Sequence, residues 1–445
     1  MRLSFRLLII FFSFCNVVNA HRWPWMIKVS YSPFSKIKSK YSICSRSSFN
    51  KKKIEQAVEH LFPYAIDLKS FYDEQPSLEE VCALARKNRS FVVRVLLNEC
   101  DHVSLAQWNF VSDEGFMVQA INCTDGHPKK MVRVASFTVM IKQGSLFYKG
   151  KRLKHGVRLR SVNGHGIFNG VAYDGDFCII PHKNSFLCIN YVGLEDYIAA
   201  VLKTESWPGW PLEVNKVFAI ACRSYVVFKV LEAKRTGRVF HVKNSNVHQT
   251  YQGRHDKQIL KQAVKETQAM VLGFKGRPVL AMFDSCCGGI IPAHIADFDF
   301  YKAPYLARDY ACTYCKSSSL YSWKVSYEFA LFDKLLKEHN YDIARCKSIR
   351  IIAKDKAGLV KEVRFDGYKK HMIISGKQLY SMVKEIKSFK FDVCKKLDEI
   401  VFSGVGFGHH LGLCQWGARQ MVREGFDYKS ILSFYYPETQ LMRLG

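Results

Sequence analysis

The sequence predicts an α+β protein in which a mostly antiparallel sheet, or small barrel elements, leads into helices that frame a central cleft. Between residues 91 and 192, short runs rich in β-branched residues alternate with turn clusters, a pattern typical of successive strands. From residue 194 onward, apolar residues recur at helical spacing. With 445 residues and 48% apolar content, the chain is long enough to bury a substantial core.

Residues 1–20 have the composition of a secretory signal peptide. Arg2 and Arg6 give a positive start, residues 7–14 are apolar, and small residues precede His21. We therefore expect an exported protein of the periplasm or cell envelope, with an uncleaved anchor as the alternative. No later run reaches about 18 consecutive apolar residues, so we expect no membrane span once the signal is removed.

Residues 21–90 form a lysine-rich segment that we interpret as a basic accessory region. An amphipathic helix is predicted over residues 54–61, and Ser77 with Glu80 forms the capping box of a second helix. No function follows from this segment.

The β-rich part, residues 91–192, opens with the apolar run FVVRVLL at Phe91. Its length and composition are those of a buried strand. Further strands are expected over residues 133–141, 146–148, 157–162, 177–180 and 187–192.

Glu205 ends the next element, a helix predicted over residues 194–205. It continues the apolar stripe of Leu194, Ile198 and Val201, so its carboxyl should point inward. Apolar neighbours such as Trp207 would raise the pKa of such a carboxyl and make it a candidate general acid. Alternatively, it is hydrogen-bonded to turn amides or to an arginine of the following helix.

A second helix is predicted to begin at Pro211 and to end near Gly237. Arg223 lies off the centre of its buried stripe. It either reaches the cleft, where it binds substrate or steadies Glu205, or is only a member of an ion pair on the surface.

Two segments after this helix add candidate substrate-binding residues. Gln249 lies in VHQTY, before a helix predicted over residues 259–264. Ser285 lies in a predicted strand, residues 279–289, that ends in a glycine turn able to present its hydroxyl. No glycine-x-serine-x-glycine elbow surrounds Ser285, which excludes a serine hydrolase.

The remaining chain is predicted to contain a helix over residues 328–337 and strands over 349–353 and 360–365. In the glycine-rich stretch that follows, His409 and Gln415 can offer polar groups to a ligand, although a lone histidine is more often structural. A last helix should begin near Gln415 and end at Gly425.

Fourteen of the 15 cysteines follow the predicted signal, scattered along the chain. Cys312 and Cys315 form a lone CxxC, without a second pair or a histidine cluster at zinc spacing. The sequence therefore does not support a metal site, and a disulfide or two free thiols is expected there. No cofactor is predicted.

The charge is strongly basic, with 66 Lys and Arg against 39 Asp and Glu and a net charge of +27. This favours an anionic partner. No nucleic-acid motif is present, so we expect no nucleic-acid partner, and a wall polymer or acidic lipid fits the diffuse charge equally well.

Several motifs together resemble the stage II sporulation protein D family, also known as the amidase-enhancer family. They include EDY at 195–197, Glu205, the WPGWP turn at 207–211 and ACRSY at 221–225. They continue in FDSCCGG at 283–289, GFGHHLGLCQWGA at 406–418 and LSFYYPETQL at 432–441. The resemblance spans residues 91–441 and implies that residues 91–445 form the catalytic region, with the cleft in residues 193–445.

The resemblance implies a lytic transglycosylase that cuts the glycan strands of bacterial peptidoglycan, preferably strands without stem peptides, with Glu205 as the acid. It also implies a second candidate, a non-catalytic activator that binds glycan and works through a cell-wall amidase. A third hypothesis is an envelope scaffold held by charge. The chain departs from the family at His410, which replaces a glycine, and in VHQTY, which lacks the Cys and His cluster through which some relatives bind zinc.

Overall fold

The computed structural model describes residues 91–121, 131–341, 343, 345–368 and 370–444. The predicted signal peptide and the two predicted helices of residues 21–90 lie outside these ranges. Within them, no helix combines the length and the apolar character that crossing a bilayer requires.

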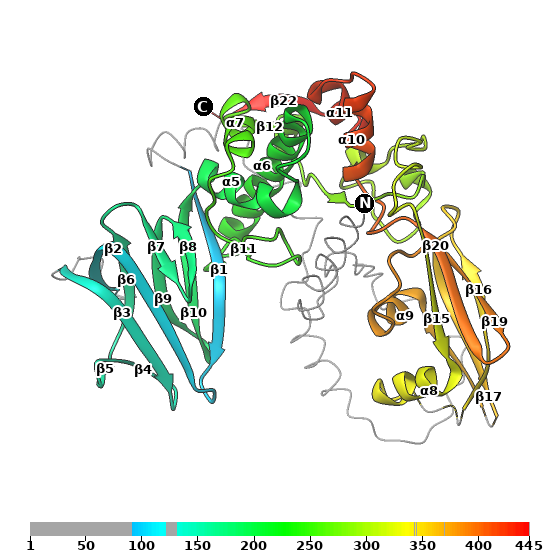
Figure 1. Cartoon of the computed structure of the whole chain (residues 1–445), viewed down its shortest axis with the longest axis horizontal. Coiled ribbons are helices and arrows are strands. Elements are labelled where there is room, and N and C mark those ends of the chain that lie inside the picture. The colour runs from blue at the N-terminus through cyan, green and yellow to red at the C-terminus, as the bar shows by residue number, and fades with distance from the viewer. Residues whose placement is uncertain (1–90, 122–130, 342, 344, 369, 445) are drawn as a thin grey trace, which may run out of the picture.

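The first part of the structure is an 11-stranded sheet, drawn in blue to green in Figure 1. Its main path runs β11-β1-β10-β9-β6-β2-β3-β4-β5, with β7 and β8 attached to β2. Every pairing is antiparallel except that of β1 with β11. The strands are β1 (Val92–Asp101), β2 (Ala106–Ile121), β3 (Val132–Lys142), β4 (Ser145–Tyr148), β5 (Lys151–Leu153), β6 (Gly156–Ser161), β7 (His165–Phe168), β8 (Val171–Asp174), β9 (Asp176–His182), β10 (Ser185–Gly193) and β11 (Val242–Lys243).

One face of this sheet is held together by aromatic side chains. Phe110 stacks on Phe168 at 4.9 Å between ring centroids and meets Phe177 edge-on at 5.3 Å. Phe110 and Phe177 are fully buried. Such aromatic pairs add stability beyond their buried area, so this cluster fixes the sheet that leads into the helices.

The antiparallel sheet predicted from the sequence is confirmed, and the strands of the described residues do not close into a barrel. Six of the observed strands match the predicted ones closely. The long strand β2 was not predicted, because Gly115, with φ +82°, interrupts its alternation and shifts the register toward β3.

The helical part lies at the top of Figure 1. It contains α5 (Leu194–Glu205), α6 (Leu212–Arg235), α7 (Gln258–Glu266), α10 (Gln415–Arg423) and α11 (Tyr428–Tyr435). The central helix α6 is buried along most of its length, with side chains such as Val217, Phe218 and Cys222 fully inaccessible. The last strand, β22 (Gln440–Arg443), returns to pair with β12 (Met270–Phe274), which also pairs with β13 (Arg277–Pro278).

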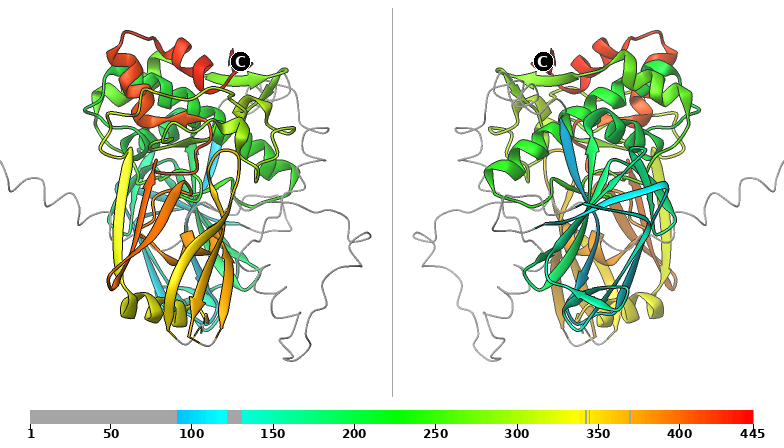
Figure 2. Two further views of the ribbon diagram at one scale, coloured as in Figure 1. Left: turned by 90° about the vertical axis from the view of Figure 1, so that its right-hand side faces the viewer. Right: turned by 90° about the vertical axis from the view of Figure 1, so that its left-hand side faces the viewer.

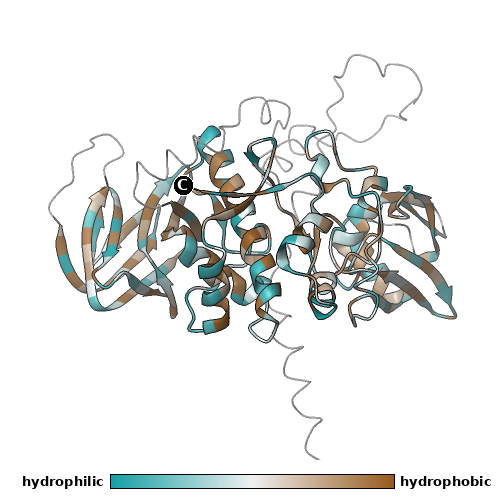
Figure 3. Cartoon of the chain, turned by 90° about the horizontal axis from the view of Figure 1, so that it is seen from above, coloured by the Kyte–Doolittle hydropathy of each residue, from teal (hydrophilic) through white to brown (hydrophobic). Residues whose placement is uncertain are grey.

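Two further three-stranded sheets form the opposite side of the molecule (Figures 1 and 2). One contains β15 (Ser322–Glu328), β19 (Phe391–Lys396) and β20 (Glu399–Val405), and the other β16 (Cys346–Lys354), β17 (Val360–Gly367) and β18 (His371–Ser375). They carry α8 (Phe329–Glu338) and α9 (Gly376–Met382). Seen from above, in Figure 3, the helical part lies between the two β-rich sides.

The predicted strand over residues 279–289 is largely a loop. Only β14 (Phe283–Asp284) is extended, and it pairs in parallel with β21 (Leu413–Cys414). The short 3-10 turns η3 (Pro292–His294) and η4 (Pro304–Leu306) follow it. This small pairing brings the FDSCCGG segment beside the start of α10.

Candidate functional site

Glu205 is the last residue of α5, and the turn after it is fixed by hydrogen bonds. The Ser206 hydroxyl donates to Asn215 Oδ1 at 2.6 Å, and Asn215 Nδ2 donates to the Trp210 carbonyl at 3.1 Å. Asn215 is fully buried in the first turn of α6. The end of α5 and the start of α6 are therefore held together around Glu205.

The Glu205 carboxylate is half-buried and contacts the segment that follows α6. The Thr250 amide donates to Glu205 Oε1 at 2.6 Å. Burial raises the pKa of Glu205 to about 7, although hydrogen bonds from the Thr250 amide and hydroxyl both lower it. The carboxyl therefore exchanges a proton near neutral pH.

The backbone at Glu205 is also anchored. Gln415 Nε2 donates to the Glu205 carbonyl at 2.8 Å, across 210 residues of sequence. The Thr204 hydroxyl donates to the Thr250 carbonyl at 2.5 Å. Three distant segments, the end of α5, the Thr250 segment and the start of α10, thus meet at one carboxyl group.

Trp207, the apolar neighbour expected to raise the pKa of Glu205, is only partly buried. Its side chain is 51% exposed, whereas Trp210 of the same turn is buried. The buried position of Glu205 at the helix end accounts for its raised pKa, and Trp207 instead offers an exposed aromatic face two residues away.

Arg223 is not brought to Glu205. Its guanidinium is fully buried and bonds both Glu195 oxygens, at 3.1 and 2.6 Å, and the Met270 carbonyl at 3.0 Å. Glu195 lies in the first turn of α5, about 15 Å along the helix axis from Glu205. Arg223 therefore joins α6 to α5 and β12, and its guanidinium is buried where the alternative interpretation expected a surface ion pair.

Gln249 lies beside the site with its side chain turned inward. It is fully buried, accepts from the Tyr197 hydroxyl at 3.0 Å and donates to the Cys222 carbonyl at 3.3 Å. These bonds anchor the segment whose next residue, Thr250, contacts Glu205.

Ser285 is half-buried after β14, and its carbonyl accepts from the Trp416 amide at 3.2 Å. It therefore lies next to the start of α10, the segment that carries Gln415. The structure thus brings Gln415 and the segment after Gln249 to Glu205, and places Ser285 beside the first turn of α10.

His409 is fully buried, and backbone groups engage both of its ring nitrogens. Nε2–H donates to the Phe283 carbonyl at 2.8 Å, and Nδ1 accepts from the Leu411 amide at 3.0 Å. Burial lowers its pKa to about 3, so the ring stays neutral. This arrangement is that of a structural histidine.

His410 has a left-handed backbone conformation. Its φ is +69°, a left-handed value that favours glycine, and its ring donates through Nδ1 to the Cys287 carbonyl at 2.9 Å. Its amide donates to Asp284 Oδ2 at 2.7 Å. Asp284 is 2% exposed, and burial raises its pKa. This second acidic side chain is therefore buried against the glycine-rich loop that carries His410.

Cys312 and Cys315 were predicted to be a lone CxxC pair, and the structure corrects this. The structure gathers their sulfurs with those of Cys287 and Cys414, all within 4.8 Å of one another. The four thiols are buried and free. In contrast, His248 of VHQTY is not in this group, and its Nδ1 accepts from the Lys243 amide at 3.3 Å.

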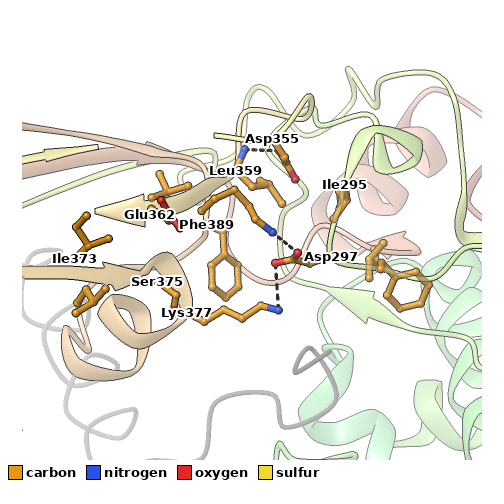
Figure 4. Close-up of a pocket in the computed structure, with 14 residues that line it drawn as sticks. Ile295, Asp297, Asp355, Leu359, Glu362, Ile373, Ser375, Lys377 and Phe389 are labelled. Atoms are coloured by element: carbon orange, nitrogen blue, oxygen red, sulfur yellow. Dashed lines mark hydrogen bonds and ion pairs between the residues drawn. The ribbon is translucent and has the colours of Figure 1, made fainter. Parts of the chain in front are cut away.

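Two cavities of the described residues do not include Glu205 in their lining. One, of about 370 Å³, lies between Ile295–Phe298 and the β16–β18 sheet, where Asp297 bridges Lys361 and Lys377 (Figure 4). The other, of about 380 Å³, lies over the first turn of α5. The carboxyl of Glu205 is therefore presented at a helix end outside both cavities.

Fold and site define a mixed α+β protein with one protonatable glutamate at a helix junction. A family model described as stage II sporulation protein matches residues 182–274, which include Glu205, Arg223 and Gln249. The chain therefore carries a domain of the stage II sporulation protein family, and the resemblance that its motifs predicted is confirmed.

Three relatives illustrate the similarity. An uncharacterized protein of Brachyspira hyodysenteriae is 29% identical over 67% of this chain and 80% of its own length. The stage II sporulation protein D of Bacillus subtilis is 23% identical over 57% of this chain and 75% of its own length. The amidase enhancer of Bacillus subtilis is 25% identical over 55% of this chain, and the match covers only 40% of that protein.

Thr250, Asn215 and the cysteine cluster were not predicted from the sequence. Thr250 is adjacent to Gln249 in VHQTY, so the VHQTY motif did point to this segment. The contact of Thr250 with Glu205 is made by its backbone amide, which a sequence motif does not reveal. The cysteines come from segments up to 127 residues apart, as the bond from the Cys287 amide to Cys414 shows. Only the fold reveals such a set.

Proposed function

We propose that this protein is an exported lytic transglycosylase of cell-wall remodelling, which cleaves peptidoglycan glycan strands, preferably peptide-free, to 1,6-anhydro products. The observation that carries the proposal is the half-buried Glu205 carboxyl, whose pKa is raised to about 7. The names of the sporulation and amidase-enhancer relatives support a role at the cell wall.

A single carboxyl suffices for this reaction. Most glycosidases use two carboxylates, one as the acid and one as the nucleophile or base. Among the described residues, burial and the Thr250 hydrogen bonds account for the pKa of Glu205, and no second charged group contributes. In a transglycosylase, the sugar's own 6-hydroxyl replaces the second carboxylate and gains from proximity.

Glu205 would act twice. As an acid, it protonates the glycosidic oxygen, the bond to the leaving sugar breaks, and the carboxylate remains. As a base, it then takes the proton of the 6-hydroxyl, whose oxygen bonds to the anomeric carbon and closes the 1,6-anhydro ring. A pKa of about 7 suits both transfers, because neither protonation state is strongly favoured at neutral pH.

The surroundings of Glu205 suit a sugar ligand. The exposed Trp207 offers an aromatic face on which the apolar side of a sugar ring can pack. The half-buried Gln415 and Ser285 bring an amide and a hydroxyl to the same region. The net charge of +27 favours approach to an acidic wall polymer.

Purified protein incubated with peptide-free glycan tests the proposal, with mass spectrometry of the products. The wild type should yield 1,6-anhydromuramic ends. Glu205→Gln keeps the shape of the side chain but removes proton transfer, so its rate should fall by about 10²- to 10⁴-fold. A Gln variant that cleaves as fast as the wild type would show that another group is the acid.

The second candidate is a non-catalytic activator of a cell-wall amidase, favoured by the similarity to the amidase enhancer. It predicts glycan binding without anhydro ends. It also predicts that Glu205→Gln stimulates an added amidase as well as the wild type does. The same mass-spectrometric measurement therefore separates the two candidates.

A further inference from the structure

Four buried cysteines converge from three segments at the β14–β21 pairing. Cys287 follows β14, Cys312 and Cys315 lie in the loop after η4, and Cys414 ends β21. We propose that Cys287, Cys312, Cys315 and Cys414 form a tetrathiolate site that binds one structural zinc ion.

The spacing of the sulfurs fits one tetrahedral ion. Zn–S bonds of about 2.3 Å place tetrahedral sulfurs about 3.8 Å apart. The Cys287 and Cys315 sulfurs are 3.7 Å apart, and all four lie within 4.8 Å of one another. A disulfide would need sulfurs about 2 Å apart, whereas the structure holds all four cysteines as free thiols.

The backbone fixes these positions before any ion binds. Asp284 pairs with Cys414 in the β14–β21 ladder, and Cys286 forms a bridge with Phe407. Gly288, with φ +63°, turns the chain directly after Cys287, and a Cβ there would lie 2.8 Å from the Gly406 amide. Two of the three segments are thus set in register by the fold itself.

Hydrogen-bond donors surround the sulfurs, as a thiolate requires. Cys414 Sγ accepts from the Cys287 and Gly417 amides, both at 3.3 Å, and caps the first turn of α10. The Tyr435 hydroxyl is 3.2 Å from Cys312 Sγ. Hydrogen-bond donors of this kind and a helix N-terminus both favour the thiolate form of a cysteine, which is the form that binds a metal.

Gly417 permits this packing. A Cβ at this position would lie 2.9 Å from Cys312 Sγ and 2.1 Å from the Tyr435 hydroxyl oxygen. Any side chain there would push α10 away from the Cys312 loop. The first turn of α10 therefore packs directly on the cysteine cluster.

The chemistry of the donors selects the metal and its role. Four soft thiolates in a tetrahedral arrangement are typical ligands of zinc. All four ligand positions are protein sulfurs and all four side chains are buried, so no position is left for water or substrate. The ion would therefore be structural.

The cysteine site is adjacent in sequence to Gln415, which contacts the candidate acid Glu205. Cys414 precedes Gln415, which bonds the Glu205 carbonyl, and Cys287 follows Ser285 by two residues. The ion would lock β14 to the start of α10, whose Gln415 bonds the Glu205 carbonyl. This last consequence rests on the proposed function, whereas metal binding does not.

The test is the metal content of the full-length protein purified under reducing conditions, measured by inductively coupled plasma mass spectrometry. We expect about one zinc ion per chain. The double variant Cys312→Ser/Cys315→Ser should lose it, whereas Cys346→Ser, a buried cysteine outside the cluster, should retain it. Glu205→Gln should also retain zinc, so failure of the proposed function is separable from failure of this site.

Cobalt replacement keeps the proposal testable if the double variant does not fold. Wild-type protein refolded with Co²⁺ should show intense sulfur-to-cobalt charge-transfer bands and the visible bands of a tetrahedral ion. A zinc-free protein whose four cysteines react as free thiols, or are joined as disulfides in its peptide mass map, would overturn the proposal. So would zinc retained at full occupancy in a folded double variant.

Discussion

The proton affinity of Glu205 is set by two opposing effects at the end of α5. Burial disfavours the carboxylate and raises the pKa, while the Thr250 amide and hydroxyl stabilise the carboxylate and lower it. The result, a pKa of about 7, lies between the ordinary value and that of a fully desolvated acid. One neighbouring residue therefore tunes the candidate acid.

Thr250→Val tests this balance. The variant removes the hydroxyl donor but keeps the amide, so the pKa of Glu205 should rise by about one unit. Cleavage needs the protonated acid first, and activity should therefore persist to a pH about one unit higher than in the wild type. The pH dependence of kcat/KM measures this shift.

Thr204→Val is the matched control, because its hydroxyl donates to the Thr250 carbonyl and not to Glu205. In its pH profile of kcat/KM, the fall in activity at alkaline pH should stay near that of the wild type. An alkaline limb that stays in place in Thr250→Val, or moves to lower pH, would contradict the role given to the Thr250 hydroxyl.

For single residues, the sequence predicted the place of a residue in its helix better than the groups that its side chain contacts. The helical stripe placed Glu205 at the end of α5, as observed. The same spacing argument could not show that Arg223 bonds Glu195 or that backbone groups saturate His409, because both contacts join segments far apart in the chain. Side-chain burial at such places depends on tertiary packing.

At the level of elements, α10 links the glycine-rich loop to the candidate acid through Gln415. Gln415→Ala removes the 2.8 Å bond to the Glu205 carbonyl. Because this bond positions the acid, kcat should fall about tenfold with KM nearly unchanged. Steady-state cleavage kinetics on peptide-free glycan provide the measurement.

The control for this prediction lies on the same helix. Gln420 Nε2 bonds Glu424 on the exposed side of α10, so Gln420→Ala changes the same residue type without touching Glu205. Equal losses in the two variants would indicate a general loss of helix stability. A Gln415 variant with wild-type kcat would contradict the positioning role.

The Arg223–Glu195 pair, in which the Arg223 side is buried and Glu195 is partly exposed, joins α6 to the first turn of α5. Arg223→Met leaves the Met270 carbonyl without its donor and the Glu195 carboxylate with only the Ala269 amide, and should lower the free energy of unfolding by about 3 kcal/mol. Urea unfolding measures this change.

The control is Lys261→Met, which breaks an exposed pair with Asp256. It should lower the free energy of unfolding by less than about 1 kcal/mol. Equal costs would contradict a structural role for Arg223.

Elements with strong local periodicity were predicted well. The runs that became β1 and β10 and the stripes of α5 and α6 follow from side-chain patterns of two and 3.6 residues. Residues 279–289 were predicted as a strand because their apolar run resembles one. The two extended residues of this segment instead pair with β21, 130 residues later, an interaction that no local pattern encodes.

At the scale of the whole molecule, the site depends on the packing of segments that are distant in sequence. The helical part lies between the first sheet and the two smaller sheets, and it collects α5, the Thr250 segment and α10 at Glu205 (Figure 1). The sequence predicted the α+β class from element order. It could not predict the four-cysteine cluster, because only Cys312 and Cys315 are close in sequence, whereas Cys287 and Cys414 come from distant segments.

The same packing implies that the raised pKa is a property of the folded protein. The carboxyl has an ordinary pKa of 4.5 and a folded value of about 7. The folded state therefore binds the Glu205 proton more tightly than the unfolded state. This contribution to stability is fully present below the unfolded pKa and is lost as the pH rises through about 7.

The most direct measurement is a pH titration of the side-chain carboxyl carbons by NMR, on protein labelled with ¹³C at glutamate Cδ. The resonance that is missing from Glu205→Gln identifies the residue. We predict that it titrates with a midpoint of about 7 in the folded wild type. A midpoint near the ordinary 4.5 would contradict the claim that Glu205 carries a proton at neutral pH.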